Sequence, residues 1–141
     1  MTAPLGAQPP TLSLKDLSRT LREHLAAHGW KTLMPIQAEG IGAIRSGANT
    51  LLIAPTAGGK TEAVLLPVAE RILDDSTSGV VALYVSPTRA LLNDLKRRAD
   101  ELFQGLGVTS FAWHSDIPES AKGRFIAEPS HILFTTPESI Q

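Results

Sequence analysis

The stretch Ala54-Pro55-Thr56-Ala57-Gly58-Gly59-Lys60-Thr61 decides the fold of this 141-residue chain. A short apolar run, Thr50 to Ala54, precedes it and predicts a buried parallel strand. The residues from Thr61 to Leu73 follow it and predict a helix. The junction therefore lies at a helix N-terminus, where unpaired N–H groups and the positive end of the helix dipole face an anion. We predict a phosphate-binding loop at this junction.

The residue types within the loop suit a nucleoside triphosphate. Gly58 and Gly59 let the backbone curl around phosphate oxygens without a clash at Cβ. Lys60 is the expected point charge on the terminal phosphates, and the Thr61 hydroxyl is the expected ligand for Mg²⁺. Ala54 stands where the stricter form of this pattern has glycine. The alternative is an ordinary strand–turn–helix corner with a surface lysine, but the position between strand and helix favours nucleotide binding.

Composition excludes several classes of protein. Lys and Arg number 13 against 14 Asp and Glu, so no overall basic field attracts nucleic acid, and such binding needs a local groove. The chain has no cysteine, which excludes a disulfide framework and a zinc finger and suits a reducing cytoplasm. The longest apolar run, Val80 to Val85, is too short to span a bilayer, and no export signal is visible. We expect a cytoplasmic protein without a membrane partner.

Alternating helix and strand patterns predict the domain organisation. The Pro- and Gly-containing residues 1–12 are expected to form a flexible tail, and residues 13–141 a single domain. Strand and helix alternate four times, which predicts an α/β fold with a parallel sheet and helices on both faces. The expected strands are residues 50–54, 80–85, 108–113 and 131–135, and the expected helices are residues 14–29, 35–46, 61–73, 91–103 and 119–127.

Three further segments, together with the loop, occur in an order that is typical of one family. Residues 29–37, Gly-Trp-Lys-Thr-Leu-Met-Pro-Ile-Gln, resemble the Q-motif of superfamily 2 helicases, and Gln37 precedes Lys60 by 23 residues. Residues 86–91, Ser-Pro-Thr-Arg-Ala-Leu, are similar to motif Ia, and residues 135–139, Thr-Thr-Pro-Glu-Ser, to motif Ib. The residues of these segments look most like those of the large helicase-related (Lhr) group of DEAD/DEAH-box-like enzymes. The resemblance covers about residues 14–141 and implies a partial RecA-like P-loop domain, incomplete at its C-terminus.

The resemblance implies ATP and Mg²⁺ as cofactors. The Gln37 amide can donate to and accept from an adenine edge, and Trp30 would pack near the base. The alternatives are a glutamine at a helix start and an aromatic residue of the core. Lys60 and Thr61 would serve catalysis, with Thr61 also binding the metal. The implied nucleotide-binding residues are Trp30, Gln37, Ala54, Pro55, Thr56, Ala57, Gly58, Gly59, Lys60, Thr61 and Glu62.

The resemblance also implies contacts to a nucleic-acid backbone. Pro87, Thr88 and Arg89 follow one expected strand and open a helix, so Thr88 and the local N–H groups can face a phosphodiester oxygen. Thr136, Pro137 and Glu138 hold the same place after a later strand. Ligands of open parallel sheets gather at the carboxyl ends of the strands, where both segments are expected. The alternative for Thr88 is a plain helix cap.

Two other features allow a functional and a structural interpretation. Lys96-Arg97-Arg98 could form a basic patch, but its position within a helix favours a solvated face. His114 either holds a loop position of the family or is a surface histidine without a catalytic task.

The acids that ATP hydrolysis requires are not evident. An aspartate must hold Mg²⁺ and a neighbouring acid must orient the attacking water. The family supplies an Asp-Glu pair after motif Ib, where only residues 139–141 remain here. Asp100-Glu101 lies inside a helical repeat, and Asp74-Asp75 closes the helix after the loop, so neither pair would face the phosphates. Whether the chain alone is an enzyme therefore stays open.

Together these patterns predict the ATP-binding and nucleic-acid-binding portion of an ATP-dependent DNA or RNA helicase, truncated before the Walker B motif. The alternative is a stand-alone binding module, or a split-helicase subunit without ATPase activity whose partner is the remaining part of the helicase. A P-loop kinase would leave Gln37 and the two nucleic-acid segments without a purpose. An incomplete sheet should leave an unpaired edge and uncovered apolar surface, which predicts marginal stability, self-association or dependence on a partner.

Overall fold

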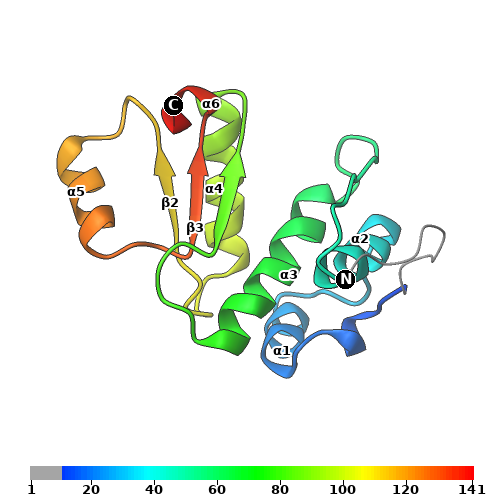
Figure 1. Cartoon of the computed structure of the whole chain (residues 1–141). Coiled ribbons are helices and arrows are strands. Elements are labelled where there is room, and N and C mark those ends of the chain that lie inside the picture. Colours follow the sequence, from blue (N-terminus) through cyan, green and yellow to red (C-terminus); the bar gives the residue numbers. More distant parts are fainter. Residues whose placement is uncertain (1–10) are drawn as a thin grey trace. The chain divides into compact units, whose positions relative to one another are not determined.

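The computed structural model describes residues 11–141, and the chain divides into two compact units, Met1–Arg71 and Ile72–Gln141 (Figure 1). The expected tail, residues 1–12, lies outside the described residues except for Thr11 and Leu12. The Leu12 N–H donates to the carbonyl oxygen of Ala38 at 2.9 Å. Within the described part of the chain, no helix combines the length and the apolar character that crossing a bilayer demands.

The first unit begins with two short helical elements where the sequence predicts one helix. The 3-10 helix η1 spans Leu14–Asp16, and α1 spans Arg19–Ala27. Ser13 caps η1, because its N–H and its hydroxyl both donate to the Asp16 carboxylate, at 2.7 and 2.9 Å. The prediction of a single helix over residues 14–29 is wrong, because Leu17 has an extended backbone (φ −77°, ψ 157°) and Ser18 caps a new helix. The Ser18 hydroxyl accepts the N–H of Leu21 at 3.4 Å.

Helices α2 (Pro35–Arg45) and α3 (Lys60–Asp75) complete the first unit, with the last residues of α3 belonging to the second unit. Pro35 opens α2 at a position where the missing N–H costs no hydrogen bond. The apolar stripes that predicted these helices are buried, which supplies most of the stabilisation of short helices. The buried apolar residues of this unit are Leu17, Leu21, Leu25, Ala38, Ile41, Ala63, Leu65, Leu66 and Ala69.

The segment before the loop, residues 50–54, is not a strand, so one of the four expected strands is wrong. Its side chains alternate as in a strand, because Leu51 and Ile53 are exposed whereas Leu52 is half-buried. Leu52 contacts α2 at Gly40, where a Cβ would lie only 2.9 Å from its Cδ2. Helices are the only regular secondary structure among the described residues of this unit, and a strand forms only when a neighbour pairs with its backbone groups.

A buried carboxylate joins three elements of the first unit. Glu70 of α3 is 6% exposed and accepts the N–H of Ser18, the α1 cap, at 2.6 Å. The Arg45 guanidinium, at the end of α2, donates to the same carboxylate through Nη2 and, at 2.7 Å, through Nε. Arg45 Nη2 also donates to the Asp16 carbonyl at 3.0 Å. This network fixes the start of α1 and the end of α2 to α3.

The second unit is a three-stranded parallel sheet with helices. Strands β1 (Ala82–Val85), β2 (Ser110–Trp113) and β3 (Ile132–Thr135) lie in the order β1-β3-β2, with Ala82 and Ser110 both opposite Ile132. The helices are α4 (Arg89–Leu102), α5 (Glu119–Ala127) and α6 (Pro137–Ile140). The predicted α/β class is confirmed, and three of the expected strands form.

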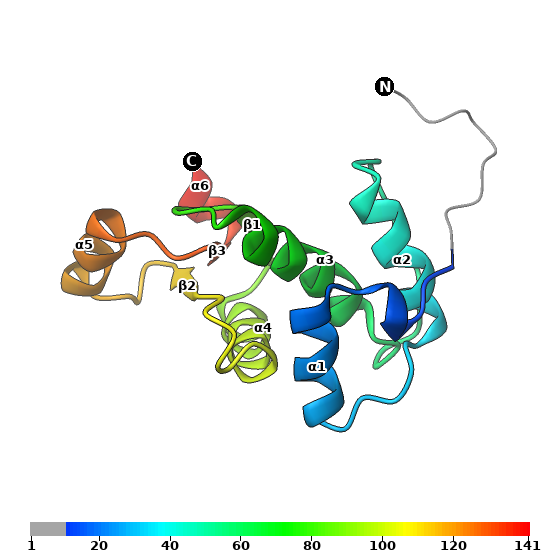
Figure 2. The same ribbon diagram turned by 90° about the horizontal axis from the view of Figure 1, so that it is seen from below.

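Helices lie on both faces of this sheet, as predicted. Ala112, Ile132 and Phe134 share the buried face, and α4 packs against β2 and β3 (Figure 2). On the opposite face, Phe125 of α5 stacks on Phe111 of β2 with ring centroids 4.6 Å apart. That face is uncovered at β1, where Leu83 and Val85 remain 54% and 44% exposed.

Candidate nucleotide and nucleic-acid sites

The loop between residues 54 and 60 has a backbone that only small residues fit. Ala57 and Gly59 both adopt left-handed conformations, with φ of +63° and +81°. A Cβ on Gly58 would lie 2.8 Å from the Pro55 carbonyl oxygen, and one on Gly59 would lie 2.6 Å from Gln37 Nε2. A non-glycine residue with positive φ is strained, and such strain concentrates at functional sites. The loop is therefore a tight cradle at the start of α3.

Lys60 directs its charge into this cradle. It is the first residue of α3, and its Nζ donates to the carbonyl oxygens of Ala54 and, at 3.2 Å, of Pro55. An ammonium has three hydrogens, so one remains for an anion. Thr61 and Glu62 follow on the first turn of α3 and are half-buried. The positive helix end and the lysine charge together suit a phosphate group.

Gln37 connects α2 to the loop. Its side chain is buried, with Oε1 accepting the N–H of Met34 at 2.9 Å and Nε2 donating to the Gly59 carbonyl at 3.3 Å. The first bond is the helix-start role that sequence left open, and the second fixes Gln37 to the loop. The amide oxygen keeps a second lone pair and the amide nitrogen keeps a second hydrogen, so both atoms can still bond a ligand. Trp30 is half-buried in the segment after α1, where its backbone N–H donates to the Leu25 carbonyl oxygen.

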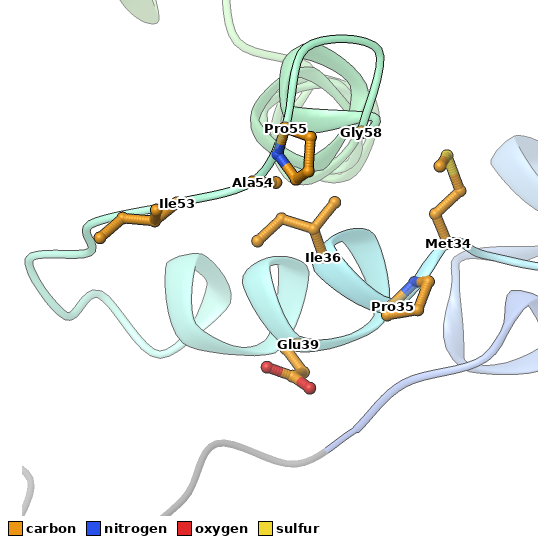
Figure 3. A pocket seen from close by; sticks show the side chains of 8 residues that line it. All are labelled: Met34, Pro35, Ile36, Glu39, Ile53, Ala54, Pro55 and Gly58. Atoms are coloured by element: carbon orange, nitrogen blue, oxygen red, sulfur yellow. The ribbon is translucent and has the colours of Figure 1, made fainter.

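A pocket of about 450 Å³ lies between α2 and the loop (Figure 3), within the size range of small-molecule sites. Ile36 projects from α2 toward Ala54 and Pro55, whereas the Glu39 carboxylate lies on the other side of the helix. Sequence reasoning missed the pocket residues Met34, Pro35, Ile36, Glu39 and Ile53, although four of them stand within or next to the Q-motif. The lining residues are Met34, Pro35, Ile36, Glu39, Ile53, Ala54, Pro55 and Gly58.

The expected nucleic-acid residues gather at the carboxyl ends of the strands in the second unit. Pro87 and Thr88 lie between β1 and α4, which begins at Arg89, and Thr136 lies between β3 and α6, which begins with Pro137 and Glu138. Figure 1 shows that α4 and α6 begin beyond the ends of these strands. Thr88 caps α4, because its Oγ1 accepts the N–H of Leu91 at 3.2 Å. The cap interpretation is thus correct, and it leaves the hydroxyl hydrogen available as a donor. The residues expected to bind nucleotide and those expected to bind nucleic acid belong to different units.

Hydrogen bonds at the start of α6 stabilise the ionised carboxylate of Glu138. Its backbone N–H and the Thr136 hydroxyl bond the carboxylate and lower the pKa of Glu138 below its ordinary value, and the nearby charge of Arg89 lowers it further. Thr136 itself is buried, and its hydroxyl lies 3.1 Å from that of Ser139. Glu138 therefore stays ionised at neutral pH, and its carboxylate lies near the charge of Arg89.

The Lys96-Arg97-Arg98 run lies on an ion-paired helix face. Lys96 Nζ contacts Asp100, and Arg97 contacts Asp94 at 2.6 Å and Glu101 at 2.7 Å. These partners stand three or four residues away on α4, the spacing at which helix side chains meet. The solvated-face interpretation is therefore favoured, and Asp100 and Glu101 take part in ion pairs on this helix.

His114 is buried at 4% exposure, so the interpretation as a surface histidine is wrong. Its Nδ1 accepts the N–H of Asp116 at 3.3 Å, and its Nε2 lies 3.3 Å from Asn93 Oδ1 on α4. His114 thus connects the end of β2 to α4.

The comparison with protein families identifies the class. The model of the DEAD/DEAH box helicase family matches residues 34–141, from the start of α2 to the end of α6. This range contains the loop, Gln37 and both strand-end segments. The chain therefore belongs to the DEAD/DEAH box helicases.

Individual relatives agree with this class. The chain is 36% identical over 121 residues to the Lhr helicase/probable uracil glycosylase of Mycolicibacterium smegmatis, covering 75% of the chain and 8% of that relative. It is 34% identical over 123 residues to the ATP-dependent helicase Lhr-Core of Sulfolobus acidocaldarius, covering 78% of the chain and 14% of that relative. Lhr helicases are thus among its relatives, and the chain spans only a small part of their length.

Solved structures show the same fold. The Mycobacterium smegmatis helicase Lhr bound to ssDNA and AMP-PNP matches with a TM-score of 0.81 and 34% identity, covering 90% of this chain and 18% of that chain. The DUF1998 helicase MrfA bound to DNA matches with a TM-score of 0.80 and 27% identity, covering 94% and 18%. The fold is therefore similar to the RecA-like helicase fold of these proteins.

Proposed function

We propose that this chain forms the ATP-binding and nucleic-acid-binding part of an ATP-dependent DNA or RNA helicase. The cradle at Gly58 and Gly59, with the Lys60 charge inside it, is the observation that carries the nucleotide part. Membership of the DEAD/DEAH box helicases supports it, because ATP use is a family property. The Lhr relative solved with ssDNA and AMP-PNP gives further support.

The residues of the first unit fit a nucleoside triphosphate with Mg²⁺. The backbone N–H groups of the cradle and the start of α3 bind phosphate oxygens, and Lys60 adds a positive charge. The Thr61 hydroxyl holds the metal, which neutralises phosphate charge when bound. Gln37 and the pocket beside it receive the adenine, with Trp30 near the base. The amide donates and accepts along the adenine edge, which selects adenine over guanine.

The residues of the second unit fit a phosphodiester backbone. The Thr88 hydroxyl, the Arg89 guanidinium and the N–H groups at the starts of α4 and α6 are donors at one edge of the sheet. Backbone contacts of this kind position a strand without reading its sequence. We therefore expect little dependence on base composition.

We expect that these residues do not hydrolyse ATP by themselves. Asp100 contacts Lys96 and the Ser110 hydroxyl, and Glu101 contacts Arg97, so these acids have structural roles on α4. The acids that would hold Mg²⁺ and orient water would have to come from further helicase segments. Such a partner, the remaining part of a split helicase, would also cover the exposed side chains of Leu51 and Ile53.

Titration calorimetry with ATP and Mg²⁺ tests the nucleotide part. We expect binding by the wild-type chain and at least about tenfold weaker binding by Lys60→Ala, because a charge contact to phosphate is lost. Lys15→Ala, which removes an exposed lysine of the same unit, is the matched control and should bind normally. Phosphate release should stay at background with and without single-stranded DNA.

Two results would contradict the proposal. A folded chain that takes up no adenine nucleotide would overturn the nucleotide part. Robust turnover that Lys60→Ala abolishes would overturn the statement that these residues do not hydrolyse ATP by themselves.

A further inference from the structure

The guanidinium of Arg89 already has an anionic partner. Its Nη1 donates to Asp116 Oδ2 at 2.9 Å, and the two side chains are 53% and 66% exposed. Arg89 opens α4 after β1, whereas Asp116 lies between β2 and α5, so the pair joins two strand-end segments. A carboxylate therefore already bonds one of the guanidinium donors that a phosphate could use.

The backbone of Asp116 is held there by a contact to a buried histidine. The Asp116 N–H donates to Nδ1 of His114, which leaves the ring proton on Nε2. Nε2 then donates to Asn93 Oδ1, one turn of α4 beyond Arg89. Because His114 is buried, this contact fixes the loop of Asp116 to the same helix that carries Arg89. The ion pair thus rests on a positioned loop and on a positioned helix start.

We propose that Asp116 is a built-in competitor for the nucleic-acid phosphate on Arg89. The inference rests on the proposed nucleic-acid function and adds a regulatory contact to that site. A phosphodiester that bonds Arg89 through Nη1 must displace the Asp116 carboxylate, and one that bonds the other guanidinium hydrogens still meets its negative charge, so the contact lowers affinity.

The amide variant Asp116→Asn separates this role from the role of the loop. It removes the competing charge but retains the backbone N–H that His114 accepts. An exposed ion pair contributes little free energy, so we expect affinity for single-stranded DNA to rise about two- to fivefold. If this variant does not fold, Asp116→Ser serves the same purpose.

Fluorescence anisotropy with a fluorescein-labelled oligothymidylate measures the effect on the full 141-residue chain. The variants are Asp116→Asn, Arg89→Ala and the double substitution, each checked by thermal melting. Arg89→Ala should weaken binding, and Asp116→Asn should give no gain when Arg89 is absent, because the competitor then has nothing to mask. Glu128→Gln is the control. It makes the same change in net charge at an exposed site before the amino end of β3.

The outcomes distinguish the two proposals. An unchanged affinity in Asp116→Asn, or an equal gain in the Arg89→Ala background or in Glu128→Gln, overturns the competitor role and leaves nucleic-acid binding intact. Binding that Arg89→Ala does not weaken has the same consequence. If folded wild-type chain and all folded variants fail to bind, both proposals are overturned.

Discussion

Gly59 illustrates how a single residue combines two demands. Its φ of +81° lies in the left-handed region, and its Cα hydrogen faces the Gln37 amide and the Met34 sulfur. Gly47 has nearly the same φ, +78°, but a Cβ there would meet nothing within 4 Å. The two glycines therefore separate backbone strain from steric contact.

Replacing each glycine by alanine should separate these costs. We expect Gly47→Ala to lower the free energy of unfolding by about 1 kcal/mol, the strain of a left-handed alanine. Gly59→Ala should cost about 1–3 kcal/mol more, because the new methyl displaces Gln37. Urea denaturation measures both values, and ATP titration should show weaker binding for Gly59→Ala alone. Equal losses of stability would contradict the contact with Gln37.

The free energy of unfolding should depend on pH through Asp16. The N–H of Ser13 and then its hydroxyl hold the pKa of Asp16 below its ordinary value of 3.8, and Arg45 adds a smaller effect. Since the folded pKa is the lower one, this stabilisation is present above pH 3.8 and is lost as the pH falls through the folded value. Urea denaturation of wild type and Asp16→Asn should therefore differ at pH 7 and converge toward pH 3. A difference that is the same at both pH values would contradict this.

At the scale of elements, Glu70 shows how helices that are far apart in sequence are fixed together. It accepts hydrogen bonds from the start of α1 and from Arg45 at the end of α2. Nothing in the local pattern around Glu70 predicts these partners, because Ser18 stands 52 residues away. The position of the residue in α3 is predictable, whereas its role is not.

The charge of Glu70 should matter more than an exposed ion pair. Glu70→Gln leaves Arg45 without its charged partner, and we expect a loss of about 2 kcal/mol, reduced from the fully buried case because Arg45 is partly exposed. Glu23→Gln, which breaks an exposed pair with Arg19, is the control and should change the free energy of unfolding little. Chemical denaturation measures both. A loss for Glu70→Gln no larger than the control would show that the network does not stabilise the first unit.

At the scale of the whole molecule, exposed apolar side chains occur in both units. Leu51 and Ile53 are 83% and 80% exposed, and Leu83 and Val85 of β1 are also exposed. Exposed apolar residues on strand-like segments favour association with other chains. The predicted self-association or marginal stability stays a prediction, and a monodisperse monomer with cooperative melting would contradict it.

Replacing Leu51 and Ile53 together by threonine should reduce this self-association. The midpoint of thermal unfolding should change little, because these side chains bury little surface in the chain itself. Ile126→Thr, on an exposed part of α5, is the control and should leave association unchanged. Sedimentation velocity measures the association state. An unaltered distribution in the double variant would show that another surface is responsible.

The sequence alone determined the α/β class, the loop and most helices, because these depend on local periodicity and capping. The bounds of α5 and the first residue of α2 match the sequence prediction. The sequence also predicted that Thr88, Arg89 and Thr136 lie at the carboxyl ends of strands, and parallel strands bring these ends to one edge of the sheet.

Only the tertiary structure decided the rest. The segment at residues 50–54 has the pattern of a strand but no strand partner within the described part of its unit, and strand formation requires such a partner. The pairing of Arg89 with Asp116, 27 residues apart, and the burial of His114 depend on how β2 and α4 pack. Local patterns carry no information about such distant partners, because the chain path that brings them together is set by the packing of the whole unit.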